Sequence, residues 1–149
     1  MGFCSISAKA NENNKYVYRL TQNGAISCLA NTVFYEANVE PTEGKVLVAI
    51  SVLNRAIRQN TSICSIVKQP SQYSFYKTGF NWNTRATHEK SVEVVLDILR
   101  KSMLGLQSSY GGITHFHAIG ISPSWASSKQ FKLFKREGNH MFYIQKESK

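Results

Sequence analysis

The sequence predicts a single α+β domain in which helices come first and a small antiparallel sheet comes last. Apolar residues recur at helical spacing through the first part of the chain, and from residue 113 the period changes to two. With 149 residues, the chain is long enough to bury a hydrophobic core without a disulfide or a metal ion. We expect residues 21–149 to form the domain and residues 1–20 to form an N-terminal arm, either loose or as an edge strand.

Three helices are predicted from the apolar pattern. The first covers residues 21–38 and ends there because Pro41 forces the residue before it out of helical geometry. The second, residues 43–58, is apolar nearly all round, which is typical of a central helix surrounded by others, and Thr42 is its predicted N-cap. The third, residues 87–104, has an apolar stripe on one face.

The remaining segments have no helical period. Residues 69–83 are rich in aromatic, amide and hydroxyl side chains, and we interpret them as a binding loop. Residues 113–118 alternate in polarity like a strand. Residues 131–135 and 140–145 flank Gly138-Asn139, which indicates a β-hairpin.

The composition restricts the class of partner. Eighteen lysines and arginines against nine acidic residues leave a net charge of +9, which attracts polyanions such as nucleic acid or an anionic bacterial envelope. The apolar runs are far shorter than the roughly 20 residues that span a bilayer, so we expect no membrane insertion. Because the basic residues are spread through all the predicted elements, we expect no specific nucleic-acid partner, and a nucleic-acid binder is a weaker alternative.

Cysteine usage and the N-terminus bear on the compartment. Cys4, Cys28 and Cys64 are odd in number and contain no Cys-x-x-Cys pair, so we expect reduced thiols in a protein made in the cytoplasm. Residues 1–7 contain neither the basic region nor the apolar region of a secretory signal. If the target lies outside the cytoplasm, another agent must release the protein.

Glu36 is the candidate catalytic residue. It lies three residues after Val33 on the apolar stripe of the first predicted helix, where a carboxylate is unusual. Partial burial, the nearby Glu40 and Glu43 and the negative end of the helix dipole would all raise the pKa of this carboxyl group. Such a group could act as an acid near neutral pH, although an ordinary solvated glutamate at a helix end is an equal alternative.

A second catalytic carboxylate is hard to find. Glycosidic cleavage usually uses two carboxyl groups, one on each side of the scissile oxygen. Glu89, Glu93 and Asp97 fit the polar face of the third predicted helix instead. A mechanism with a single carboxyl group, in which the substrate supplies its own nucleophile, fits this sequence better.

Several motifs, in order along the chain, resemble those of one family. They are Phe34–Gly44 (FYEANVEPTEG), Val48–Arg55 (VAISVLNR), Ile63–Val67 (ICSIV), Gln72–Ser74 (QYS), Gly112–Ala118 (GITHFHA), Pro123–Ala126 (PSWA) and Gly138–Tyr143 (GNHMFY). Together they resemble the cell-wall hydrolase family of the spore cortex-lytic enzyme SleB, particularly its phage endolysin-type branch. The resemblance covers residues 26–143, and Asn38 departs from the commoner pattern after the Glu-Ala pair.

The resemblance implies a lysozyme-like, lytic transglycosylase-like fold and an enzyme that acts on peptidoglycan glycan strands. It implies that the bond cleaved is the β-1,4 bond between N-acetylmuramic acid and N-acetylglucosamine. By this analogy Glu36 protonates the leaving oxygen and then takes a proton from the C6 hydroxyl of muramic acid, which leaves a 1,6-anhydro sugar. We expect a monomer without a cofactor or metal, and a phage endolysin released through a holin.

Other side chains are candidates for binding the saccharide, since amide, hydroxyl and aromatic groups suit neutral sugars. They are Gln72, Tyr73, Ser74, His115, His117 and Trp125. A structural role is an alternative for each. The alternative chemistry is a zinc-dependent peptidoglycan amidase or endopeptidase, in which His115, His117 and His140 would hold the metal ion.

Overall fold

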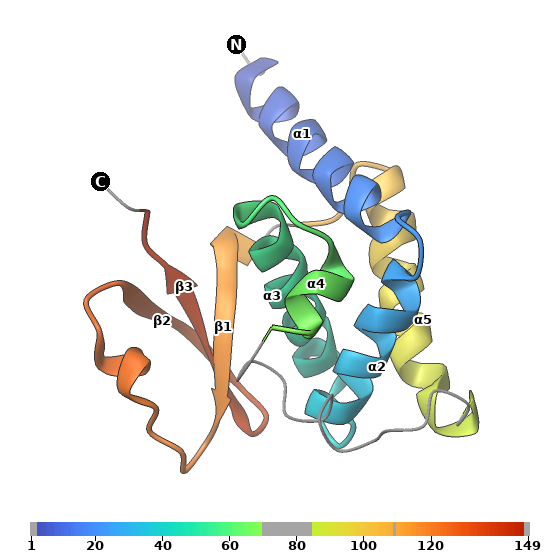
Figure 1. The fold of residues 1–149 in the computed structure, drawn as a ribbon. Helices are drawn as coiled ribbons and strands as arrows, with labels where there is room; N and C mark the ends of the chain where they lie inside the picture. The colour runs from blue at the N-terminus through green and yellow to red at the C-terminus, as the bar shows by residue number, and fades with distance from the viewer. Residues whose placement is uncertain (1–2, 70–84, 109, 148–149) are drawn as a thin grey trace.

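A lobe of helices and a three-stranded antiparallel sheet lie side by side in the computed structural model of the chain (Figure 1). The structure describes residues 3–69, 85–108 and 110–147, and it describes the side chains of residues 12–69, 88–108 and 110–147. The predicted class is therefore confirmed: a mainly helical lobe precedes a small sheet at the C-terminal end.

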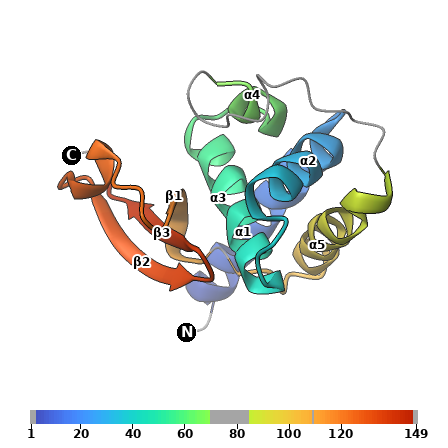
Figure 2. The same ribbon diagram turned by 90° about the horizontal axis from the view of Figure 1, so that it is seen from below.

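The central helix is α3, Thr42–Arg58, and its apolar side chains are buried on all sides. Figure 2 shows α2 and α5 on one side of it and the sheet on the other. The surrounding helices are α1 (Phe3–Leu20), α2 (Ala25–Ala37), α4 (Ile63–Val67) and α5 (Arg85–Met103). None of the helices in the described residues is both long enough and apolar enough to cross a bilayer.

Helix α1 corrects the expectation for the N-terminus. Residues 3–20 form a helix rather than a loose arm or an edge strand. Tyr16 and Leu20, four residues apart on one helical face, join the same hydrophobic core as the rest of the chain, and the Tyr16 hydroxyl donates a hydrogen bond to Asn54 at 2.6 Å. The short alternation of polarity near Tyr16 does not form a strand. Tyr16 and Leu20 are buried because α1 packs against the other helices, and the local sequence does not show this packing.

The boundaries between α2 and α3 follow the sequence closely, although α2 begins at Ala25, four residues after the predicted start. Helix α2 ends at Ala37, as Pro41 predicts. Pro41 itself occupies the N-cap position of α3, so Thr42 is the first helical residue and not the cap. The N-cap therefore lies one residue earlier than predicted, at a proline whose φ is fixed by its ring.

The sheet has the strand order β1-β3-β2, with strands β1 (Ile113–Ala118), β2 (Phe131–Glu137) and β3 (His140–Gln145). Strands β2 and β3 form the predicted hairpin around Gly138-Asn139. Strand β1 packs against α3, so it is the strand that joins the sheet to the helical lobe.

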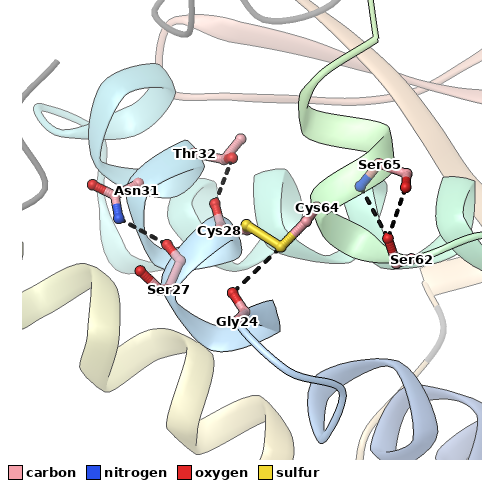
Figure 3. Close-up of a disulfide and its surroundings, with 8 residues drawn as sticks. All are labelled: Gly24, Ser27, Cys28, Asn31, Thr32, Ser62, Cys64 and Ser65. Carbon is pink, nitrogen blue, oxygen red and sulfur yellow. Dashed lines mark hydrogen bonds between the residues drawn. A yellow bond between two sulfur atoms is a disulfide. The ribbon is translucent and has the colours of Figure 1, made fainter. Parts of the chain in front are cut away.

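A disulfide between Cys28 of α2 and Cys64 of α4 corrects the expectation of free thiols (Figure 3). The Cα atoms of the two residues are 5.4 Å apart, although 36 positions separate them in the sequence. The spacing of cysteines along the chain does not report how two helices pack, and therefore the pairing could not be predicted. The side chain of Cys4 lies outside the described residues.

The double replacement of Cys28→Ser and Cys64→Ser is expected to lower the free energy of unfolding by about 3–4 kcal/mol, because the disulfide closes a 36-residue loop in the unfolded chain. Urea unfolding under oxidising conditions measures this difference. In reductant, the wild type and the double variant should unfold together. A double variant that is as stable as the oxidised wild type would contradict the pairing.

Candidate active site

The side chain of Glu36 lines a cleft of about 530 Å³ between the end of α2, helix α3 and the sheet, which we call the Glu36 cleft. The residue is half-buried and lies one position before the end of α2. The whole lining comprises Glu36, Arg55, His115, Phe116, His117, Ala118, Ile121, Trp125, Phe131 and His140. The structure thus brings the candidate acid together with both histidines of β1 and with Trp125.

Burial raises the pKa of Glu36 from 4.5 to about 7. Its carboxyl group forms no hydrogen bond or ion pair within the described part of the chain, so burial alone explains the shift. The expectation that Glu40 and Glu43 contribute to it is not supported. A group with this pKa is protonated in a large fraction of molecules at neutral pH and can donate its proton.

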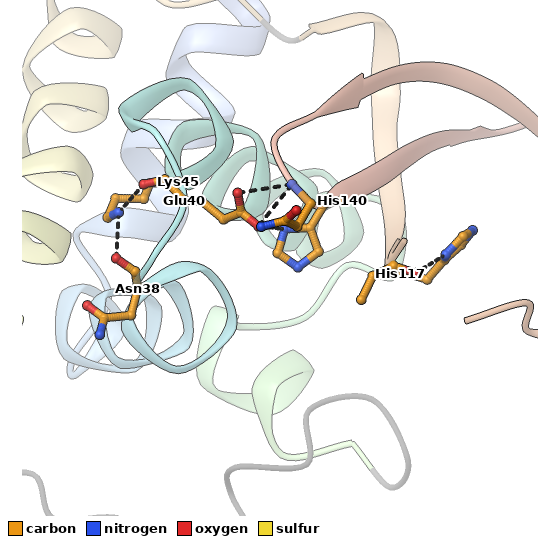
Figure 4. A network of polar contacts seen from close by, with 7 residues as sticks. Asn38, Glu40, Lys45, His117 and His140 are labelled. Carbon is orange, nitrogen blue, oxygen red and sulfur yellow. Dashed lines mark hydrogen bonds and ion pairs between the residues drawn. The ribbon is translucent and has the colours of Figure 1, made fainter. Parts of the chain in front are cut away.

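Glu40 is turned toward the hairpin (Figure 4). Its carboxylate is 6% exposed and accepts a hydrogen bond from the backbone N–H of Asn139, with its two oxygens at 3.1 and 3.2 Å from that nitrogen. Gly138 has a φ of +57°, and a Cβ at this position would lie 2.1 Å from Oε2 of Glu40. The carboxylate therefore holds the turn between β2 and β3 against the connection between α2 and α3.

Lys45 holds the same connection from the other side. Its ammonium group donates hydrogen bonds to the backbone carbonyls of Asn38, at 3.0 Å, and of Glu40 (Figure 4). These carbonyls follow the last turn of α2, where a cation also complements the helix dipole. Burial lowers the pKa of Lys45.

Lys45 and Arg55 are functional candidates that the sequence analysis did not single out. Both belong to α3, both are 6% exposed, and Arg55 lines the Glu36 cleft. The sequence carried a partial signal, because Lys45 and Arg55 lie among the apolar residues of a helix that is apolar nearly all round, whereas Arg58 at its end is exposed.

His115 and His117 lie on β1 with their rings near the indole of Trp125, at centroid distances of 5.2 and 5.8 Å. Nε2 of His117 is 2.9 Å from the hydroxyl of Tyr143, and the two rings are stacked. Phe131 completes this aromatic wall, 5.1 Å from Trp125. Tyr143 and Phe131 were not predicted, because they come from strands that only the sheet register brings beside β1.

The charge state of His115 is set by its surroundings. Burial lowers the pKa of His115 to about 3, and the positive charges of Arg55 and Arg58 act in the same direction. The imidazole is therefore neutral at physiological pH.

The histidines do not form the metal site of the zinc alternative. Within the described residues, no three His, Cys, Asp or Glu side chains are placed to hold a metal ion together. Both ring nitrogens of His117 have other partners, the hydroxyl of Tyr143 and the backbone oxygen of Ala118. Nδ1 of His140 faces Glu40.

The predicted saccharide ligands Gln72, Tyr73 and Ser74 lie outside the described residues.

The geometry can be compared with known proteins. A family model described as Cell Wall Hydrolase matches residues 39–143. The spore cortex-lytic enzyme of Oceanobacillus iheyensis is 28% identical over 120 residues, which cover 78% of this chain and 40% of the relative. The chain therefore spans less than half the length of this curated relative.

Two solved structures share the fold. The catalytic domain of the germination-specific lytic transglycosylase SleB from Bacillus anthracis superposes with a TM-score of 0.65 and 21% identity, covering 81% of this chain and 94% of that one. The catalytic domain of Bacillus cereus SleB gives a TM-score of 0.64 and 21% identity, covering 81% and 90%.

These comparisons define the class of fold as lysozyme-like, with the architecture of the SleB catalytic domain. The chain belongs to the cell wall hydrolase family, as its motifs indicated. The family match begins at residue 39, three residues after Glu36. The assignment of Glu36 therefore depends on the geometry of the cleft.

Glu36→Gln is expected to stabilise the protein at high pH and to leave its stability unchanged at low pH. The pKa of Glu36 is raised on folding, so its ionised form destabilises the folded state above about pH 7, and this effect disappears below pH 4.5. We expect the free energy of unfolding to rise by roughly 1–3 kcal/mol at alkaline pH.

Urea unfolding at the two pH extremes measures this effect. Glu89→Gln, which removes an exposed carboxylate from α5, is the matched control and should change little at either pH. An equal effect of Glu36→Gln at both pH values would show that the carboxyl group titrates normally.

Proposed function

We propose that this chain is a lytic transglycosylase that cleaves the β-1,4 bond between N-acetylmuramic acid and N-acetylglucosamine in peptidoglycan. The observation that carries the proposal is the half-buried carboxyl group of Glu36, with a pKa of about 7, in a cleft of the cell wall hydrolase fold. The names of the structural relatives, which include a lytic transglycosylase, support the same reaction class.

In the proposed mechanism Glu36 is the only acid and base. Its protonated carboxyl group gives a proton to the glycosidic oxygen while the bond from that oxygen to C1 of muramic acid breaks. The C6 hydroxyl oxygen of the same sugar then bonds to C1, and its proton passes to the Glu36 carboxylate. The products are a free N-acetylglucosamine end and a 1,6-anhydro sugar, and Glu36 is protonated again.

The distribution of carboxylates supports a mechanism with one acid. Within the described residues, Glu36 is the only carboxyl group that lines the Glu36 cleft. Glu40 holds the hairpin turn. On α5, Glu93 and Asp97 form ion pairs with Lys90 and with Lys101, at 3.8 and 3.0 Å.

The opposite wall of the cleft is suited to a sugar ring. Trp125 is half-buried and packs against His115 and Phe131, so its indole is held in place and keeps an exposed part for stacking on a saccharide. His115 adds a polar group on the same wall, and His117 lies beside it with both ring nitrogens already paired to Ala118 and Tyr143. Gln72, Tyr73 and Ser74 stay proposed saccharide ligands on the basis of the sequence alone.

We propose that the protein works as a monomeric, endolysin-type lysin that reaches the wall after release from the cytoplasm through a holin. The net charge of +9 supports the step at the wall, because it attracts the protein to an anionic bacterial envelope. In this proposal the Cys28–Cys64 disulfide forms after release, since the cytoplasm keeps thiols reduced.

Digestion of purified sacculi tests the proposed reaction, with the products identified by mass spectrometry. The wild type should release 1,6-anhydro-muropeptides, and Glu36→Gln should lower the rate by at least about 10²-fold, because the amide cannot donate the proton. Glu89→Gln, which also removes one negative charge, should keep wild-type activity. A fully active Glu36→Gln protein, or products with only reducing muramic acid ends, would refute the proposal.

A further inference from the structure

Glu40 and His140 form a carboxylate–histidine pair at the edge of the Glu36 cleft. Nδ1 of His140 is 3.2 Å from Oε1 of Glu40, and both side chains are buried. His140 also lines the Glu36 cleft. His140 therefore reaches the cleft, while Glu40 holds the hairpin turn through its contacts with Asn139 (Figure 4).

The ring of His140 is held in one orientation. Phe116 and Phe142 contact it edge to face, at centroid distances of 5.3 and 6.0 Å. The ring nitrogen that does not face Glu40 points away from the carboxylate in Figure 4. This nitrogen, Nε2, has no hydrogen-bond partner among the described residues.

His140 is neutral at physiological pH. Burial has the largest effect and lowers its pKa, Glu40 raises the pKa by less, and the nearby His117 lowers it further. A neutral imidazole has one protonated nitrogen and one bare nitrogen. The groups that contact the two nitrogens decide which of them carries the proton. The contact between Nδ1 and the Glu40 carboxylate lacks hydrogen-bond geometry, but at 3.2 Å the negative charge attracts a proton on Nδ1 and repels a bare nitrogen there, so it favours the tautomer with a proton on Nδ1.

We infer that Glu40 is a positioning residue that keeps Nδ1 of His140 protonated, so that Nε2 accepts a hydrogen bond from a hydroxyl or amide N–H group of the glycan. The inference deepens the proposed function and rests on it for the identity of the ligand. Glycan strands carry such donors on every sugar. The place of His140 in the lining of the Glu36 cleft puts this acceptor in the same cleft as the acid.

A purely structural role explains less of the geometry. The turn at Gly138-Asn139 needs one acceptor for the N–H of Asn139, and Glu40 already supplies it. An apolar side chain at position 140 would pack between the two phenylalanines without an imidazole to desolvate. The imidazole adds an acceptor on the cleft side, which the hairpin itself does not use.

The first test reads the tautomer directly by ¹⁵N NMR of histidine-labelled protein at neutral pH. In the wild type, Nδ1 of His140 should be protonated and Nε2 should be bare. In Glu40→Gln, the amide oxygen can keep the N–H of Asn139 while the amide NH₂ faces Nδ1 and donates to it, so the tautomer should shift toward a proton on Nε2.

Glu137→Gln is the matched control for this test. Glu137 lies opposite His140 in the sheet register and pairs with Lys135 at 3.2 Å, so its replacement removes a nearby negative charge without touching the pair. The tautomer should stay unchanged in this variant. A wild-type protein with Nε2 protonated and Nδ1 bare would overturn the inference, whether or not any variant folds.

The second test measures kcat/KM on soluble, uncrosslinked glycan strands. His140→Asn keeps an amide donor for Glu40 but has no atom at the position of Nε2. We expect kcat/KM to fall roughly 10-fold with a melting temperature close to that of the wild type, as for the loss of one substrate hydrogen bond. A folded His140→Asn protein with wild-type kcat/KM would overturn the inference.

The two proposals fail in different ways. If the proposed function is wrong, the wild type releases no anhydro products, but the tautomer of His140 can still be measured. If only the inference is wrong, the wild type and Glu36→Gln behave as the proposed function requires, while His140→Asn is fully active or the tautomer is reversed.

Discussion

The partial burial of one carboxyl group, that of Glu36, is the constraint on which the rest of the site depends. The group lies at the end of α2, where it has no cation or hydrogen-bond donor to stabilise its charged form among the described residues, and its pKa rises to about 7. In the proposed mechanism, a single acid that both gives and takes a proton near neutral pH removes the need for a second carboxylate. The rest of the lining of the Glu36 cleft consists of aromatic rings, histidines, an arginine and the apolar residues Ala118 and Ile121.

The position of this group depends on how the helical lobe and the sheet are joined. Lys45 holds the carbonyls just after α2, and Glu40 holds the turn between β2 and β3. Gly138 is required there, because the carboxylate of Glu40 occupies the space that a side chain would need. The short connection between α2 and α3 thus fixes the position of Glu36, at the end of α2, relative to the wall of the cleft that the sheet forms.

The parts of the fold that could be predicted from the sequence are those with a local physical cause. Pro41 predicts the end of α2, Gly138-Asn139 predicts the hairpin, and the all-round apolar pattern predicts the burial of α3. The partial burial of Glu36 was predicted in the same way, from a carboxylate on an apolar stripe. At these positions the sequence predicts the structure correctly, because the structure there is determined by residues that are neighbours in the chain.

The remaining features depend on contacts between distant segments. Tyr16 and Leu20 are buried only because α1 packs on the other helices. The disulfide requires α2 and α4 to be neighbours, and the pairing of Glu40 with Asn139 joins residues 99 positions apart. Such contacts leave no periodic signal in the sequence.

The central claim is that folding raises the pKa of the Glu36 carboxyl group. Titration of its side-chain carbon signal by ¹³C NMR in the folded protein, assigned through the Glu36→Gln variant, measures this pKa directly. We expect a midpoint near pH 7. A midpoint near the ordinary value of 4.5 would contradict it, because the carboxyl group would then be ionised at neutral pH and could not serve as the acid.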